Sequence, residues 1–179
     1  MGFRISWIGL KDIEAPKALA LAGLRDTEEV DEASESFASW TTLPANWVII
    51  FYNDFNYPSD EFLQLLSAGC SVLSAQIHEG IMYSGIRYHD HGEELWSVSH
   101  DCENGIYDVD VSGEPPSLLT AIRDRLTAKQ RDAGERCGVD YVFDVPVELA
   151  EAMCGYRHDR WRFEWGKPIF RKAEPISRG

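Results

Sequence analysis

Cysteine is scarce in this sequence, and long apolar runs are missing. The 179 residues include four cysteines that lie far apart and form no Cys-x-x-Cys pair, namely Cys70, Cys102, Cys137 and Cys154. Disulfide-stapled secreted domains and zinc motifs need close or numerous cysteines, so we expect reduced thiols. The first residues show no apolar signal-peptide region, and no stretch approaches the ~20 apolar residues of a membrane helix. We therefore expect a cytoplasmic protein without a membrane partner.

Basic charge is also in short supply, and only the C-terminal end of the chain has an excess of it. The net charge is −13, yet residues 156–179 carry seven basic and three acidic side chains, a net of +4. Residues 1–155 carry ten basic and 27 acidic side chains, a net of −17. Such a body repels nucleic acid and attracts a basic protein partner. Acidity that only keeps the protein soluble is the alternative.

The clearest pattern present is a series of four apolar-rich runs between residues 70 and 111, separated by short polar or glycine-containing breaks. The breaks Glu79-Gly80, His89-Asp90-His91-Gly92 and Asn104-Gly105 are typical of hairpin turns. After Gly92, Trp96 and Val98 alternate with small polar residues, which is the period of a strand with one buried face. The pattern predicts an antiparallel meander with Trp96 on the buried side.

The rest of the chain predicts strands over residues 3–10, 37–43 and 47–52. Helices are expected over 14–22, after Ser59, over 117–133, and from Asp144 to Gly155. The fold class is therefore α+β: a mainly antiparallel sheet, with a ferredoxin-like βαββαβ start extended by the meander and helices packed on one face. A parallel α/β fold is the alternative. Residues 1–155 are expected to form one domain, on which residues 156–179 pack as a basic, aromatic C-terminal arm.

Two segments carry a resemblance to other proteins. They are Trp96-Ser-Val-Ser-His-Asp101 and Tyr141-Val-Phe-Asp-Val-Pro-Val-Glu-Leu149, the second followed by Gly155-Tyr-Arg-His-Asp159. In these stretches the chain resembles a group of small uncharacterised bacterial proteins. The resemblance implies a bacterial, cytosolic protein and brings no activity with it.

One end of the predicted meander gathers residue types used in hydrolases. The turn at residues 79–80 brings His78 and Glu79 to the sheet end where the run ending in His100, Asp101 and Cys102 emerges. His78, His100 and Cys102 are candidate zinc ligands, while His78, Glu79, His100 and Asp101 are candidate catalytic residues. The alternative is ordinary: strand-end histidines with structural hydrogen bonds, beside acids that favour turns.

Three further stretches are candidate binding surfaces. Residues 26–35 hold six acids and no base, and we expect a solvated loop that meets a basic partner. The polar and aromatic stretch 53–58 suits the rim of a small-molecule site, or else an Asx turn before a helix. In the arm, three aromatic residues at alternate positions either complete a core or form a partner-binding strand. The candidate binding residues are Glu28, Glu29, Asp31, Glu32, Asn53, Asp54, Tyr57, Trp161, Phe163 and Trp165.

These observations leave three functions open. The first is an acidic interaction protein that binds a basic protein partner, in the manner of an immunity protein or inhibitor. The second is a metal-dependent or acid–base hydrolase that uses the His78/His100 end, and the third is a small-molecule-binding regulatory module. The sequence favours a binding protein over an enzyme, predicts no cofactor and leaves the oligomeric state open.

Overall fold

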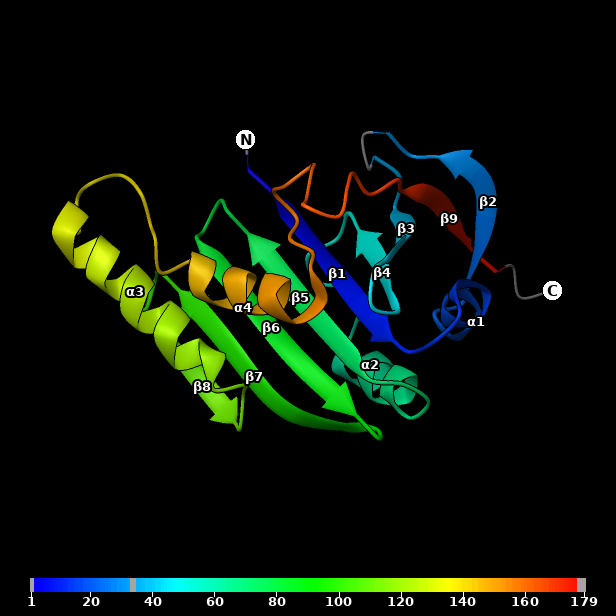
Figure 1. Cartoon of the computed structure of the whole chain (residues 1–179), viewed down its shortest axis with the longest axis horizontal. Helices are drawn as coiled ribbons and strands as arrows, with labels where there is room; N and C mark the ends of the chain where they lie inside the picture. Colours follow the sequence, from blue (N-terminus) through cyan, green and yellow to red (C-terminus); the bar gives the residue numbers. More distant parts are fainter. Residues whose placement is uncertain (1, 33–34, 177–179) are drawn as a thin grey trace.

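The computed structural model describes residues 2–32 and 35–176, which form one antiparallel sheet of nine strands with four helices against it (Figure 1). The strands are β1 (Arg4–Lys11), β2 (Leu24–Val30), β3 (Ala38–Leu43), β4 (Trp47–Tyr52), β5 (Val72–His78), β6 (Tyr83–Asp90), β7 (Glu93–Asp101), β8 (Asp110–Gly113) and β9 (Arg171–Pro175). The helices are α1 (Ala15–Leu21), α2 (Asp60–Ser67), α3 (Leu118–Ala133) and α4 (Asp144–Cys154). The order across the sheet is β2-β9-β3-β4-β1-β5-β6-β7-β8. The predicted α+β class is confirmed.

The two central strands β1 and β4 are apolar on both faces. Trp7 pairs with Phe51 across the ladder, and the next residue, Ile8, pairs with Ile50. All four side chains are buried, and successive side chains of a strand point to opposite faces. Each face of the sheet therefore needs its own cover.

Two separate cores provide that cover. The α4-side core contains Trp7 and Phe51 with apolar residues of α3 and α4, whereas the α2-side core contains Ile8 and Ile50 with residues of α1 and α2. Figure 1 shows α4 lying across one face of β5 and β6, with α2 behind the sheet. The expectation that the helices share one face is wrong, because an unbroken apolar run such as that of β4 buries side chains in both directions.

The meander is confirmed as β5 to β8, with neighbouring strands paired in sequence order. The β6–β7 turn consists of His91 and Gly92, since Asp90 pairs with Glu93. Trp96 is buried and stacks on Tyr88 at 5.5 Å between ring centroids, as the alternation predicted. The last strand is shorter than expected, because it begins only at Asp110.

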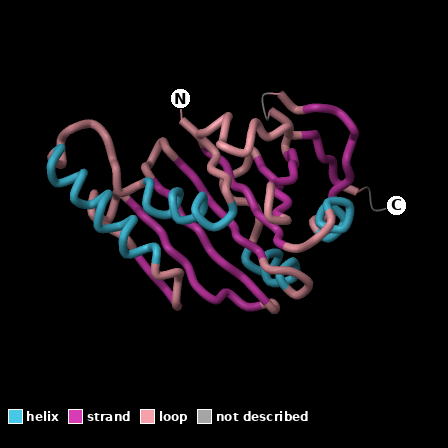
Figure 2. The backbone as a smooth tube through the Cα atoms, viewed as in Figure 1, coloured by secondary structure: helices cyan, strands magenta, loops and turns pink. Residues whose placement is uncertain are grey.

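The largest departure from expectation lies at the other edge of the sheet. Residues 24–30 form strand β2, although the acids from residue 26 onward predicted a solvated loop; residues 33 and 34 of that stretch lie outside the described part. Strand β9 inserts between β2 and β3, where Ala173 pairs with Asp26 on one side and with Ala38 on the other. The C-terminal arm thus belongs to the sheet. Figure 2 shows the long loop between α4 and β9 crossing over one end of the central strands.

This insertion makes a direct prediction about stability. Ala173 is buried in the α2-side core, so Ala173→Asp places an unpaired carboxylate there. We expect a loss of about 3 kcal/mol or more in the free energy of unfolding, measured by urea titration. Truncation after Gly155 should be at least as damaging, because it removes β9 and leaves β2 without a neighbour.

The matched control is Glu174→Gln on the same strand, whose exposed carboxylate pairs with Arg25. Exposed pairs contribute little, so we expect a change within about 0.5 kcal/mol. If Ala173→Asp and Glu174→Gln unfolded at the same urea concentration, the inserted position of β9 would be refuted.

Candidate functional site

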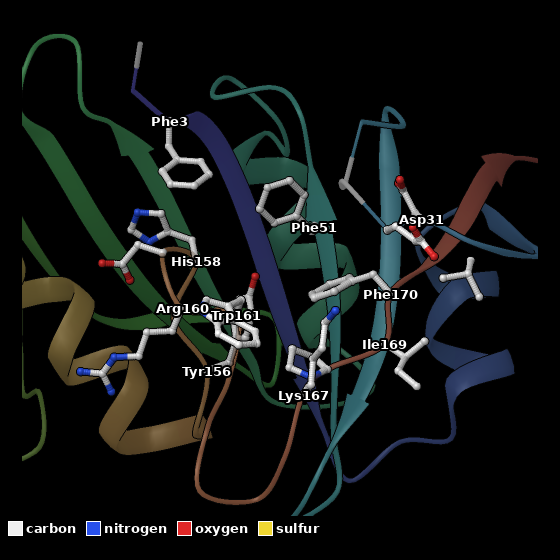
Figure 3. Close-up of a pocket in the computed structure, with 14 residues that line it drawn as sticks. Phe3, Asp31, Phe51, Tyr156, His158, Arg160, Trp161, Lys167, Ile169 and Phe170 are labelled. Carbon is white, nitrogen blue, oxygen red and sulfur yellow. The ribbon is translucent and has the colours of Figure 1, made fainter.

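A hollow of the described structure lies on the α4 side of the sheet, between the ends of β1 and β4 and the arm that crosses them (Figure 3). Its volume is about 770 Å³. Three segments line it: strand residues of the α4-side face, the end of β2 with the turn after it, and residues 156–170 of the arm. The lining residues are Phe3, Val30, Asp31, Glu32, Phe51, Tyr156, His158, Asp159, Arg160, Trp161, Lys167, Pro168, Ile169 and Phe170.

Aromatic side chains form much of the wall. Tyr156 is buried beneath the pocket and packs edge-on against Trp7 at 5.3 Å between ring centroids. Phe170 contacts Tyr156 at 5.9 Å and Phe51 at 6.2 Å, and so joins the arm to the strands. Aromatic rings in such edge-on and tilted contacts hold a fixed geometry, because their quadrupoles favour it. The floor of the pocket is therefore a rigid part of the core.

Three exposed apolar side chains lie at the pocket mouth. Trp161 is 69% exposed and Ile169 is 65% exposed, and Val30 is also exposed. Single exposed apolar residues are common, but large ones gathered around one hollow mark a binding surface. The mouth thus offers apolar area to a ligand.

Most of the charged groups around the pocket already have internal partners. The buried guanidinium of Arg157 bonds both carboxylate oxygens of Asp159, with Nη2 2.8 Å from Oδ2, and it also bonds Asp144. Burial works against the charge of Arg157, but the bond to Asp159 and the nearby carboxylates raise its pKa. Arg160 pairs with Glu151 on α4. This network anchors the first turn of the arm to α4.

Asp31 is a structural carboxylate at the far side of the pocket. It is buried, and its two oxygens accept the backbone N–H groups of Glu35 and Ser36, each at 3.2 Å. Its own N–H donates to the carbonyl of Phe170 at 2.9 Å. Asp31 therefore ties the residues after β2 to the arm and closes one side of the pocket.

His158 is the unusual polar group of this site. Its side chain is buried, and neither ring nitrogen has a hydrogen-bond partner among the described residues; the nearest carboxylate is Glu79, 3.7 Å from Nε2. Phe3 packs edge-on against the imidazole at 5.0 Å. Burial lowers the pKa of His158, although Asp159 and Glu79 oppose the shift. A neutral imidazole can both donate and accept one hydrogen bond or proton.

The hydrolase site expected at one end of the meander is not assembled. His78 and His100 lie near the same end of β5 and β7, the strands on either side of β6, but His78 points to the α2 side, where it contacts Phe55 at 5.3 Å. His100 shares its face with Trp96 and Val98 and points to the α4 side. Alternation along β5 and β7 separates them, which a reading of strand ends alone misses. Within the described residues, no group of three or more His, Cys, Asp and Glu is placed to hold a metal ion.

His100 instead forms a buried pair with Asp140. Its Nδ1 lies 2.6 Å from the carbonyl oxygen of Asp108, and its Nε2 lies 2.8 Å from Oδ2 of Asp140. Burial alone would lower the pKa of His100, but the bonds to Asp140 and Asp108 raise it. Likewise burial opposes ionisation of Asp140, whereas His100 and the N–H groups of Val142 and Phe143 lower its pKa. The pair holds the loop before α4 against β7.

The other catalytic and metal candidates are dispersed. Glu79 accepts the N–H of Phe3 at 2.9 Å and faces His158, not His78. Asp101 accepts the N–H of Glu103 at 3.0 Å and so shapes the turn after β7. Burial and the neighbouring Asp140 raise the pKa of the Cys102 thiol, which disfavours the thiolate that binds zinc.

The acidic candidates divide between the sheet edge and the pocket. Glu28 and Glu29 are exposed on β2, and Glu29 pairs with Lys172 of β9 at 2.8 Å. Asp31 and Glu32 line the pocket. The C-terminal arm therefore neutralises part of the acidic stretch 26–35, which was expected to meet a basic partner.

The loop after β4 is a structural turn. Asp54 accepts the N–H of Asn56 at 2.9 Å, which is an Asx turn, and Ser59 accepts the N–H of Phe62 at the start of α2. Tyr57 packs on Tyr52 at 4.5 Å between ring centroids. Asn53 donates to the carbonyl of Ser36 at 2.8 Å. These contacts place Asn53, Asp54 and Tyr57 outside the pocket.

The three arm aromatics do not share one face, because this segment is a loop with a tight turn at Phe163 and Gly166. Phe163 stacks on Trp165 at 5.0 Å, and Trp165 donates to the carbonyl of Gly155 at 3.1 Å. Only Trp161 lines the pocket. Sequence reasoning missed Phe3, Phe51, Tyr156, His158, Lys167 and Phe170, which no local pattern connects.

Comparisons with protein-family models, curated proteins and solved structures give no match to this chain. Within the described residues, no helix is both long and apolar enough to cross a membrane.

The His100–Asp140 pair predicts a pH-dependent stability. The raised pKa of His100 means that its contribution is full below the unfolded value near 6.5 and is lost as pH rises through the folded pKa. The lowered pKa of Asp140 means that its contribution is full above about 3.9 and is lost as pH falls. Asp140→Asn should therefore cost most between about pH 4 and 6.5, by about 3 kcal/mol, in urea unfolding.

Asp132→Asn on α3 serves as the matched control, since Asp132 is exposed and forms no ion pair with a described residue. It should leave the free energy of unfolding within about 0.5 kcal/mol at every pH. An Asp140→Asn effect that did not vary between pH 5 and pH 9 would refute the charged form of the pair.

Proposed function

We propose that this protein is a small-molecule-binding module and that its ligand occupies the pocket beneath the C-terminal arm. The observation that carries the proposal is a hollow of about 770 Å³ whose wall combines aromatic and aliphatic side chains with charged groups, several of which already have internal partners. Binding sites for organic molecules usually span about 300–1,000 Å³ and have this mixture. The exposed Trp161 and Ile169 at the mouth support it, because a ligand would cover them.

The polar groups of the pocket fit recognition of an organic molecule. His158 offers a buried imidazole without an internal hydrogen bond, and Lys167 offers an ammonium without an ion pair to a described residue. In a binding pocket, a few such groups orient the ligand while apolar area supplies affinity. The walls are held by Asp31, Arg157 and the strands, so the site is formed before a ligand arrives.

The proposal is tested with a neutral aromatic probe, N-phenyl-1-naphthylamine, whose fluorescence rises in apolar surroundings. The wild-type protein should bind it saturably, and Trp161→Ala should weaken binding about fivefold, because one aromatic contact contributes about 1 kcal/mol. Leu65→Ala is the control, since Leu65 is 75% exposed on α2, on the opposite side of the sheet. Equal affinity for Trp161→Ala and wild type, or no binding at all, would contradict the proposal.

A second candidate function is binding of a basic protein partner, and one part of the sheet favours it. Residues 101–117 contain five acids and no lysine or arginine. This segment includes the edge strand β8, all four residues of which are exposed. Edge strands can pair with an added strand, and acids beside them would select a basic one.

The test of this second function is binding of an octalysine peptide, followed by calorimetry at low and high salt. Neutralising Glu103, Asp110 and Glu114 together should weaken binding severalfold at low salt, and the difference should shrink as exposed charges are screened. The control is a triple variant in which Asp12, Glu14 and Glu61 are neutralised. It changes the net charge by the same amount and should weaken peptide binding less than the variant at Glu103, Asp110 and Glu114. Identical losses in the two variants would leave only a general charge effect and would exclude β8 as the site.

A further inference from the structure

We propose that the pocket selects a planar, apolar molecule that carries one anionic group, such as an aryl carboxylate or sulfonate, with Lys167 as its counter-ion. This inference rests on the proposed function and adds the chemical class of the ligand. It follows from deciding which charged side chains around the pocket are still available to a ligand.

Three of the charged lining residues are already committed. Both oxygens of Asp159 bond to Arg157, both oxygens of Asp31 accept backbone N–H groups, and Arg160 pairs with Glu151. A group that already has such partners gives little extra energy to a ligand, because a new contact would have to replace an existing one. The charges left to a ligand are those of Lys167 and Glu32.

Lys167 is the better placed of these two. Both side chains are exposed, but in Figure 3 that of Lys167 lies between Trp161 and Phe170, whereas Glu32 belongs to the turn after β2. The lysine forms no ion pair with the described residues. Lys167 is exposed at the pocket, so a carboxylate or sulfonate seated there could reach its ammonium and form a charge-assisted hydrogen bond. The rings on either side would then hold the apolar part of the same ligand.

The overall charge of −13 opposes an anionic ligand only weakly at this distance scale. At physiological salt, exposed charges more than about 8 Å away are largely screened, while a direct contact is not. The internal pairing of Asp31 and Asp159 further reduces repulsion within the pocket. Local contact with Lys167 therefore outweighs the distant acids.

The experiment compares two probes that share one aromatic body. 8-Anilinonaphthalene-1-sulfonate carries a sulfonate, and N-phenyl-1-naphthylamine lacks it. Wild-type protein should bind the sulfonate about fivefold more tightly than the neutral probe, as expected for a partly exposed ion pair. Lys167→Met should abolish this preference, Lys167→Arg should retain it, and Lys17→Met on α1 should leave it unchanged, although it alters the net charge equally.

A second measurement extends the test to carboxylates. In the wild-type protein and in Lys167→Arg, 4-phenylbutyrate should displace the bound neutral probe at lower concentration than 4-phenylbutyramide or 4-phenylbutylamine. In Lys167→Met this preference for the carboxylate should be lost.

The outcomes separate the two proposals. The anionic class is wrong if the neutral probe binds but the sulfonate binds no better, or if Lys167→Met leaves the affinity for the sulfonate unchanged. In either case the pocket remains a binding site. Tighter displacement by the amine would also overturn the anionic class. If neither probe binds the wild-type protein, the proposed function fails, and this inference fails with it.

Discussion

The insertion of β9 between β2 and β3 is the constraint on which the rest of this structure depends. Ala173 pairs with strands on both sides, although it lies about 150 residues beyond one of them in the chain. This pairing draws the arm back across the sheet from the end of α4. Without it β2 would have no neighbour, and the α4-side ends of β1 and β4 would be uncovered. The pocket therefore exists because the C-terminal strand completes the sheet.

The same insertion brings basic residues of the C-terminal arm next to acidic residues of β2. Arg171 contacts Asp26 at 3.1 Å and Lys172 contacts Glu29 at 2.8 Å, so basic residues of the arm meet acids of β2. These pairs are partly exposed, and each contributes little energy by itself. Their effect is to favour antiparallel pairing of a basic strand with an acidic one over pairing of like charges. The segregation visible along the chain is in part an internal complementarity.

The pocket combines a rigid floor with a more open mouth. Its floor includes the core residue Tyr156, which packs against Trp7, while the exposed Trp161 and Ile169 lie at its edge. Two sets of hydrogen bonds secure the arm: Arg157 bonds Asp144 and Asp159, and the N–H of Asp31 donates to the carbonyl of Phe170. Such a site needs little rearrangement to accept a ligand, which reduces the ordering cost of binding. A binding role is consistent with this arrangement.

By itself, the sequence determined the features that depend on local patterns. The alternation around Trp96, a turn ending at Gly92, and the helix starting after Ser59 all follow from residues close together in the chain. Those patterns were enough for the α+β class and the meander. They also pointed to Trp161, Asp31 and Glu32 as binding residues, though for separate reasons.

Only the tertiary structure decided which of these elements meet. His78 and His100 lie near the same end of the sheet, but their side chains point to opposite faces, which the position along the strands alone does not show. Phe3, Phe51 and Lys167 come together because β9 returns the chain to the sheet, and no local periodicity records a contact between residues so far apart. Strand β2 escaped detection for the same reason, since its acids are balanced by a strand at the other end of the chain. Long-range strand pairing depends on the free energy of the whole sheet and its two cores. That free energy cannot be read from any single segment of the sequence.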